Sequence, residues 1–175
     1  MNDYNPPADL LKDHTILVTG AGDGLGRAVA KGAAAHGATV ILVGRTTGKL
    51  EIVYDEIEEA GSPQPAIFPL NFESAVEHEY QELAGIIDHE FGSLQGLVHC
   101  AAQLRLLSRI DDYDVETWNQ VLQVNLTAPF MLTQACLPVL RKAEDASIIF
   151  TSDILGKKAK AYWGGYAVSK FGIEG

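Results

Sequence analysis

The chain has 175 residues, of which 47% are hydrophobic and 21% are charged, an ordinary balance for one globular domain over residues 1–175. Thirteen Lys and Arg against 23 Asp and Glu give a net charge of −10, which argues against a partner that is nucleic acid or an anionic membrane. The apolar runs are also shorter than the roughly 20 residues that a membrane span needs, so no membrane partner is expected.

Short apolar runs alternate with amphipathic stretches along the chain. Five runs are typical of buried strands: Thr15–Thr19, Ala38–Val43, Ala66–Leu70, Leu94–Cys100 and Ser147–Ser152. Helices are predicted at Gly24–His36, Thr47–Ala60, Ser74–Phe91 and Val115–Lys142, and from about Tyr162. Residues 1–13 lack the features of a signal peptide and predict a short arm. The alternation predicts βαβ units and an α/β fold with a doubly wound parallel sheet between two helical layers.

The predicted end of the sheet is unusual. The strand at Ser147–Ser152 would lie at a sheet edge with apolar side chains uncovered, a feature that proteins usually avoid. The chain stops at Gly175, about two turns into its last helix. We therefore expect a domain that is incomplete at its C-terminal end, and the alternative is completion by a partner.

The cysteines and histidines suggest no framework for a disulfide or a metal. Cys100 and Cys136 stand in apolar stretches and are interpreted as buried free thiols, which suits a reducing cytoplasm. The five histidines show no ligand spacing, so no metal site is expected.

A glycine-rich segment follows the first strand directly and opens the first helix. Glycines permit a tight turn and let the backbone approach a pyrophosphate, while the helix N-terminus attracts the anion. The sequence therefore predicts a dinucleotide-binding loop. Its candidate contacts are Gly20, Gly22, Asp23, Gly24, Leu25 and Gly26.

The end of the second strand indicates which dinucleotide binds. An acidic residue would be expected here to hold the adenosine ribose hydroxyls, but the sequence reads Val43-Gly44-Arg45-Thr46. The Arg45 guanidinium could clamp a 2′-phosphate in bidentate fashion. This favours NADP(H) over NAD(H).

Tyr166 and Lys170 are four residues apart and so share one face of the last helix. A nearby ammonium lowers the pKa of a tyrosine, which makes its hydroxyl usable as an acid or base near neutrality. A Tyr–Lys pair at this spacing is also common by chance, so it indicates a catalytic role only together with other motifs in the chain.

Three motifs in order carry a resemblance to a known family. They are TGxxxGxG at Thr19–Gly26, Asn125 in a Val-Asn step after Trp118, and YxxxK at Tyr166–Lys170. With the stretches Phe150–Ser152 and Trp163–Tyr166, they make the chain resemble the short-chain dehydrogenase/reductase superfamily, and within it a bacterial subgroup of loosely characterised oxidoreductases. The resemblance implies a Rossmann-like three-layer fold that here lacks the family's last two strands. It also implies hydride transfer between a nicotinamide and a small carbonyl or alcohol substrate, in a homodimer or homotetramer.

The resemblance also assigns roles to single residues. Tyr166 would give or take the proton, and Lys170 would bind the nicotinamide ribose and lower the pKa of Tyr166. The main-chain carbonyl of Asn125 would hold a water in a proton relay. Pro129 gives an independent reason to expect this carbonyl to be free for a water. Proline lacks the N–H that would otherwise donate a helical hydrogen bond to the Asn125 carbonyl. Further cofactor contacts would be Asn71, Phe72 and Ala101, and Tyr166 itself would also contact the cofactor.

Two segments depart from the family pattern. The family places a substrate-binding Ser where this chain has Asp153, next to Ser152. A carboxylate there would raise the pKa of Tyr166, unless Asp153 stays protonated or a bulge presents Ser152. Cys100 and Ala102 replace the family's Asn and Gly after the fourth strand, where His99 is interpreted as structural. The alternative function is therefore a catalytically impaired nucleotide-binding relative or an inactive fragment. The residues do not identify the substrate.

Overall fold

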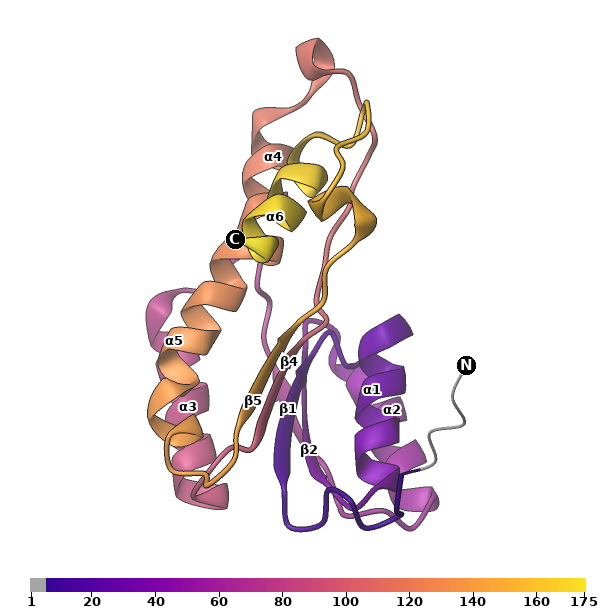
Figure 1. Ribbon diagram of the computed structural model, residues 1–175, viewed down its shortest axis with the longest axis vertical. Coiled ribbons are helices and arrows are strands. Elements are labelled where there is room, and N and C mark those ends of the chain that lie inside the picture. Colours follow the sequence, from indigo (N-terminus) through magenta and orange to yellow (C-terminus); the bar gives the residue numbers. More distant parts are fainter. Residues whose placement is uncertain (1–5) are drawn as a thin grey trace.

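The computed structural model describes residues 6–175 and has a parallel sheet between two layers of helices (Figure 1). The strands are β1 (Thr15–Thr19), β2 (Thr39–Gly44), β3 (Ala66–Pro69), β4 (Gly96–His99) and β5 (Ser147–Phe150). The helices are α1 (Gly24–Ala35), α2 (Thr47–Glu59), α3 (Glu77–Phe91), α4 (Val115–Leu122), α5 (Ala128–Leu140) and α6 (Gly164–Glu174). The strand order is β3-β2-β1-β4-β5 with every pairing parallel, which confirms the predicted doubly wound α/β fold.

Alternation along the strands divides the core into two halves. Leu17 of β1 faces α3 and α5, whereas its neighbours Ile16 and Val18 face α1 and α2. Small residues of α1, such as Ala30 and Ala34, let that helix lie close to the sheet. The two cores enclose β1, β2 and β4, and the loops that line the candidate site follow the ends of these strands.

The predicted long helix at 115–142 is interrupted. It forms α4, then a π-helical turn at Gln123–Thr127, then α5. Pro129 in the first turn of α5 lacks the N–H that a continuous α-helix would need, and the hydrogen-bond ladder widens one turn before it. The uninterrupted helix was therefore a wrong expectation, although the break falls where Pro129 pointed.

Other boundaries shift by a few residues. Helix α3 begins at Glu77 because Ser74 and Ala75 form a turn that closes on the carbonyl of Asn71. Helix α6 begins at Gly164, two residues later than expected. Residues 8–13 of the predicted arm form turns, and the Leu11 N–H donates to the carbonyl of His36 over 2.8 Å. Residues 1–5 of that arm lie outside the described part.

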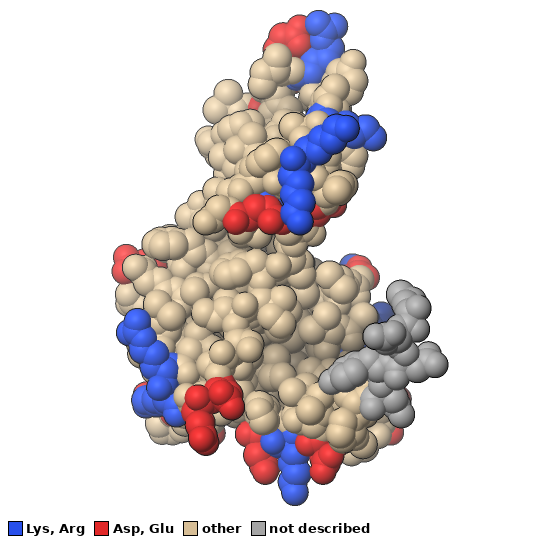
Figure 2. All heavy atoms as spheres, viewed as in Figure 1, with Lys and Arg blue, Asp and Glu red and all other residues tan. Residues whose placement is uncertain are grey.

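Strand β5 lies at the sheet edge, as predicted, and it is exposed along its whole length. Ile148, Ile149 and Phe150 are 36%, 52% and 40% exposed. Figure 2 shows an area without charged side chains on this side of the molecule, with charged residues above it and below it. Among the described residues, therefore, no element covers the outer edge of β5.

Within residues 6–175 no helix is both long and apolar enough to cross a membrane. The same described residues contain no group of three or more potential metal ligands. Both cysteines are free thiols; Cys136 is buried as expected, but Cys100 is only half-buried because it lies beside a cavity.

Candidate active site

A cavity of about 470 Å³ opens at the carboxyl ends of β1, β2 and β4, where ligands bind in parallel α/β sheets. Ten of the twelve predicted cofactor contacts line it. They are Gly20, Gly22, Asp23, Gly24, Leu25, Gly26, Arg45, Asn71, Phe72 and Ala101. The other two, Tyr166 and Lys170, lie on α6 outside its lining. The structure thus gathers residues from four loops at one edge of the sheet.

The glycine loop requires its glycines for geometric reasons. Gly20 and Gly24 have positive φ angles of 65° and 50°. A Cβ on Gly26 would lie 2.3 Å from the carbonyl oxygen of Gly20, so α1 can begin this close to β1 only with glycine there. A Cβ on Gly24 would meet nothing within 4 Å, which shows open space at the helix N-terminus. This open space beside the helix N-terminus fits a pyrophosphate.

Two side chains hold the loop from either side. Asp23 caps α1 by accepting from the N–H of Gly24 over 2.8 Å, and it pairs with Lys49 at 2.6 Å. These two contacts lower the pKa of the Asp23 carboxyl below its usual value. Thr19 accepts from the N–H groups of Cys100 and Ala101 over 3.0 and 3.1 Å, which ties the end of β1 to the loop after β4.

Arg45 lies where β2 ends and lines the cavity, with a side chain that is 65% exposed. Its Nη1 is 3.6 Å from Oε2 of Glu73. The guanidinium is therefore accessible to a ligand in the cavity, as a 2′-phosphate would require.

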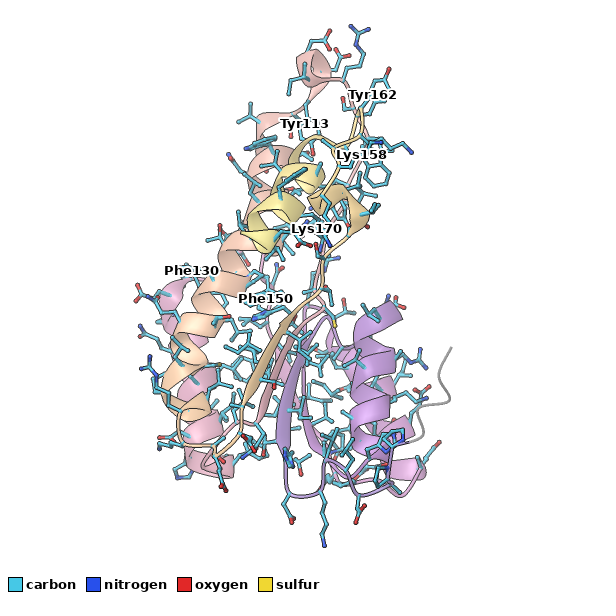
Figure 3. The ribbon with its side chains drawn as sticks, viewed as in Figure 1. Tyr113, Phe130, Phe150, Lys158, Tyr162 and Lys170 are labelled. Carbon is cyan, nitrogen blue, oxygen red and sulfur yellow. The ribbon has the colours of Figure 1, made fainter. Side chains whose placement is uncertain are left out.

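Tyr166, Lys170 and Asp153 come together between α6 and the end of β5. The Tyr166 hydroxyl lies 3.5 Å from Oδ2 of Asp153, at the outer limit of a hydrogen bond. The Lys170 Nζ is 5.6 Å from the centre of the Tyr166 ring and donates to the carbonyl of Thr151 over 2.8 Å. Figure 3 shows Lys170 below α6, directed toward the carboxyl end of the sheet. The predicted pair thus shares one face of α6, together with a carboxylate.

The electrostatics of Tyr166 differ from the expectation for a Tyr–Lys pair. Burial raises the pKa of Tyr166 above its usual 10.0, and the Asp153 carboxylate raises it further. The pKa of Lys170 is lowered by burial, since its side chain is nearly enclosed. The pKa of Tyr166 therefore moves in the opposite direction to the one expected from a Tyr–Lys pair, and the Lys170 ammonium donates to the Thr151 carbonyl. The effect of Asp153 has the predicted sign.

Asp153 and Ser152 are presented to different surroundings, as strand alternation suggested. Asp153 Oδ1 accepts from the N–H of Leu155 over 2.9 Å, and this contact directs Oδ2 toward Tyr166. Ser152 is exposed, and its hydroxyl lies against Gly156 instead. Asp153, and not Ser152, therefore lies beside the Tyr166 hydroxyl.

Asn125 is 2% exposed and uses its side chain as a bridge. Its Oδ1 accepts from the Gln103 N–H over 2.7 Å, and its Nδ2 donates to the Gln103 carbonyl and to Oγ of Ser169, over 2.9 and 3.1 Å. Asn125 therefore joins the loop after β4 to α6. The water relay through its main-chain carbonyl stays a prediction.

His99 has the structural role expected of it. It is 4% exposed, its Nε2 lies 2.9 Å from the Thr133 hydroxyl, and its ring stacks on Phe150 at 4.7 Å. Burial lowers its pKa from 6.5 to about 4. His99 is therefore a neutral part of the core.

Three further residues position the site and were not predicted from the sequence: Thr19, Gln103 and Ser169. Thr19 stands in the TGxxxGxG motif, so its strand-end position could have suggested a role. Gln103 contributes mainly its backbone, and Ser169 acts through a contact 44 residues away. No local pattern signals such contacts.

A parallel α/β sheet with a glycine loop at the start of its first helix, and a Tyr–Lys pair nearby, defines a class of nucleotide-dependent oxidoreductases. The chain matches the family model for short chain dehydrogenase over residues 14–175, and it therefore belongs to the short chain dehydrogenase family.

Individual relatives agree with this membership. An uncharacterized oxidoreductase of Escherichia coli K12, YciK, is 44% identical over 172 residues, which make up 98% of this chain and 68% of YciK. A short chain dehydrogenase structure from Pseudomonas syringae has 49% identity and a TM-score of 0.96, with 99% of this chain and 72% of that one covered. One from Shigella flexneri 2a, complexed with NADP, has 42% identity and a TM-score of 0.93, with 95% and 70% covered.

Proposed function

We propose that this chain is an NADP(H)-dependent oxidoreductase that transfers hydride between the nicotinamide and a small carbonyl or alcohol substrate. The observation that carries the proposal is the cavity at the glycine loop, with Arg45 exposed at the end of β2. The Shigella flexneri relative complexed with NADP supports the same cofactor. The alternative of an impaired relative or an inactive fragment finds no support in the comparisons.

The residues of the cavity would hold the cofactor from one end to the other. The loop Gly20–Gly26 would face the pyrophosphate, since its N–H groups and the N-terminus of α1 favour an anion. Arg45 would pair with the 2′-phosphate, and Asn71 and Phe72 would flank the adenosine. Ala101 would lie along the ribose. A bound NADP(H) would supply the hydride.

The residues of α6 would handle the proton. In carbonyl reduction Tyr166 donates its hydroxyl proton to the substrate oxygen, and in alcohol oxidation it accepts that proton. A tyrosine whose pKa is raised keeps its proton near neutrality but is a weaker acid, so the Asp153 carboxylate would slow the donor step. Lys170 would contact the nicotinamide ribose, and Asn125 would pass the proton onward through a held water. Asp153, and not Ser152, is the member of that pair that would face the substrate oxygen.

We also propose that the protein works in the cytoplasm as a homodimer or homotetramer. Phe130 of α5 and Phe171 of α6 are 63% and 44% exposed, and the uncharged area of Figure 2 lies on the same side as α5. Phe130 is directed outward in Figure 3. Light scattering coupled to gel filtration would measure the mass in solution, and a monomer would contradict this part of the proposal.

The cofactor assignment is tested by calorimetric titration of the 175-residue chain with NADPH and then with NADH. We expect micromolar binding of NADPH and much weaker binding of NADH. The variant Arg45→Gln should bring the two affinities together, and Arg109→Gln, an exposed arginine outside the cavity lining, is the matched control. The proposal would be overturned if neither NADPH nor NADH binds to the chain.

A further inference from the structure

The loop after β3 carries an acidic residue that the proposed function does not use. Glu73 follows the cavity residues Asn71 and Phe72, and its N–H donates to Oδ1 of Asn71 over 3.3 Å. Its side chain is 21% exposed and faces two guanidinium groups. Oε2 lies 3.6 Å from Nη1 of Arg45, and Oε1 lies 2.9 Å from Nη2 of Arg105. One carboxylate is therefore shared by two arginines at the rim of the cavity.

Building on the proposed function, we propose that Glu73 sets how strongly this site prefers a 2′-phosphorylated nucleotide, because it competes for Arg45 while Arg105 holds it back. A phosphate on Arg45 would come within a few ångströms of the Glu73 carboxylate, and like charges at this separation repel. Each contact between Glu73 and Arg105 weakens that competition. Glu73 therefore weakens the preference for a 2′-phosphorylated nucleotide, and Arg105 strengthens it.

Arg105 is positioned for this role by the loop after β4. Two residues earlier, both backbone groups of Gln103 are bound by the side chain of Asn125. Arg105 itself has a φ of 60°, a conformation that non-glycine residues adopt only when their surroundings hold them there. The loop therefore presents the Arg105 guanidinium to Glu73 from a fixed point.

The other charged groups beside the cavity do not replace Arg105. Lys49 of α2 is paired with Asp23 across the glycine loop, at 2.6 Å. Arg45 is thus the cation at the end of β2 for which Glu73 and a 2′-phosphate would compete.

The experiment compares the affinities of 5′-AMP and adenosine 2′,5′-bisphosphate by calorimetry, because these probes differ only in the 2′-phosphate. The ratio to follow is the affinity for adenosine 2′,5′-bisphosphate divided by the affinity for 5′-AMP. This ratio should rise about fivefold in Glu73→Gln, which corresponds to the energy of a charge–charge interaction near 4 Å in water. The ratio should fall by a similar factor in Arg105→Gln, because Glu73 then turns fully to Arg45. The matched control is Glu82→Gln, an exposed acid of α3 outside the cavity lining, and it should leave the ratio unchanged.

The outcomes separate this inference from the proposed function. An unchanged ratio in Glu73→Gln, or an equal loss of both affinities, would overturn the role of Glu73 and leave nucleotide binding standing. A change of the same sign in both variants would overturn it too, because a merely structural link would respond in that way. If the wild-type chain binds neither probe, the proposed cofactor site itself is wrong.

Discussion

The two halves of the candidate site are held together in different ways. Around the glycine loop, positions are fixed by backbone proximity, with Gly26 against Gly20 and with Thr19 tying β1 to the loop after β4. Around Tyr166, positions depend on a few side-chain contacts between α6 and the end of the exposed strand β5. Binding of the cofactor and transfer of the proton should therefore be separable by single substitutions.

The largest expected effect breaks the half with Tyr166 alone. Tyr166→Phe should lower turnover by roughly 10²–10⁴-fold, the usual contribution of a general acid, because the proton donor is lost. NADPH affinity should stay within about twofold, since the cavity is unchanged. Tyr162→Phe, at an exposed tyrosine, is the control. Turnover of a panel of carbonyl compounds and calorimetry measure the two quantities, and equal losses in both would contradict the separation.

The next effect breaks the half with the glycine loop. Gly26→Ala places a Cβ 2.3 Å from the Gly20 carbonyl, so the loop must move. We expect a loss of roughly 1–3 kcal/mol in stability and up to about 100-fold in NADPH affinity. Gly32→Ala on the same helix meets nothing within 4 Å and should be neutral or stabilising. Thermal melts measure the stability and calorimetry measures the NADPH affinity of each variant. If Gly26→Ala matches Gly32→Ala in both, the loop tolerates the added Cβ.

A third effect concerns His99, which lies between the halves and stacks on Phe150 of β5. Its folded-state pKa of about 4 is below the ordinary 6.5, so the unfolded chain binds more protons between these values. Stability should therefore fall as the pH drops from 6.5 towards 4, by about 2 kcal/mol at pH 5 from this residue. Urea unfolding at pH 7 and pH 5 measures it.

The matched variants for this pH dependence are His99→Gln and His89→Gln. Glutamine cannot take up the proton but can still hydrogen-bond to Thr133, so His99→Gln should lose less stability than wild type between pH 7 and pH 5. His89 is exposed, and its replacement should leave the wild-type difference unchanged. If His99→Gln loses as much stability between pH 7 and pH 5 as the wild type does, the pH dependence belongs to other groups.

The smallest expected effect sharpens the chemistry of the Tyr166 half. Asp153→Ser removes a carboxylate that raises the pKa of Tyr166, so that pKa should fall and turnover should rise several-fold, up to about tenfold. The alkaline limb of the pH profile for carbonyl reduction should move to lower pH, because Tyr166 then loses its proton sooner. Asp145→Ser in the loop before β5 is the control. Reduced turnover in Asp153→Ser would instead give Asp153 a role of its own.

The sequence by itself determined the class of fold and most of the binding loop. The apolar runs predicted the bounds of each strand to within about two residues, and the glycines and Arg45 predicted the binding site that the cavity forms. These features could be predicted because they depend on periodicity and backbone conformation over a few residues. The break near Pro129 also has a local cause in a missing N–H, although the periodicity predicted one uninterrupted helix there.

Only the tertiary structure decided which of Ser152 and Asp153 faces Tyr166, and in which direction the pKa of Tyr166 moves. It also decided that Asn125 binds Gln103 and that Glu73 stands between two arginines. Each of these depends on side chains that are far apart in the chain and meet where parallel strands end. Burial and charge at such a meeting point are sums over several elements, and no local pattern encodes them.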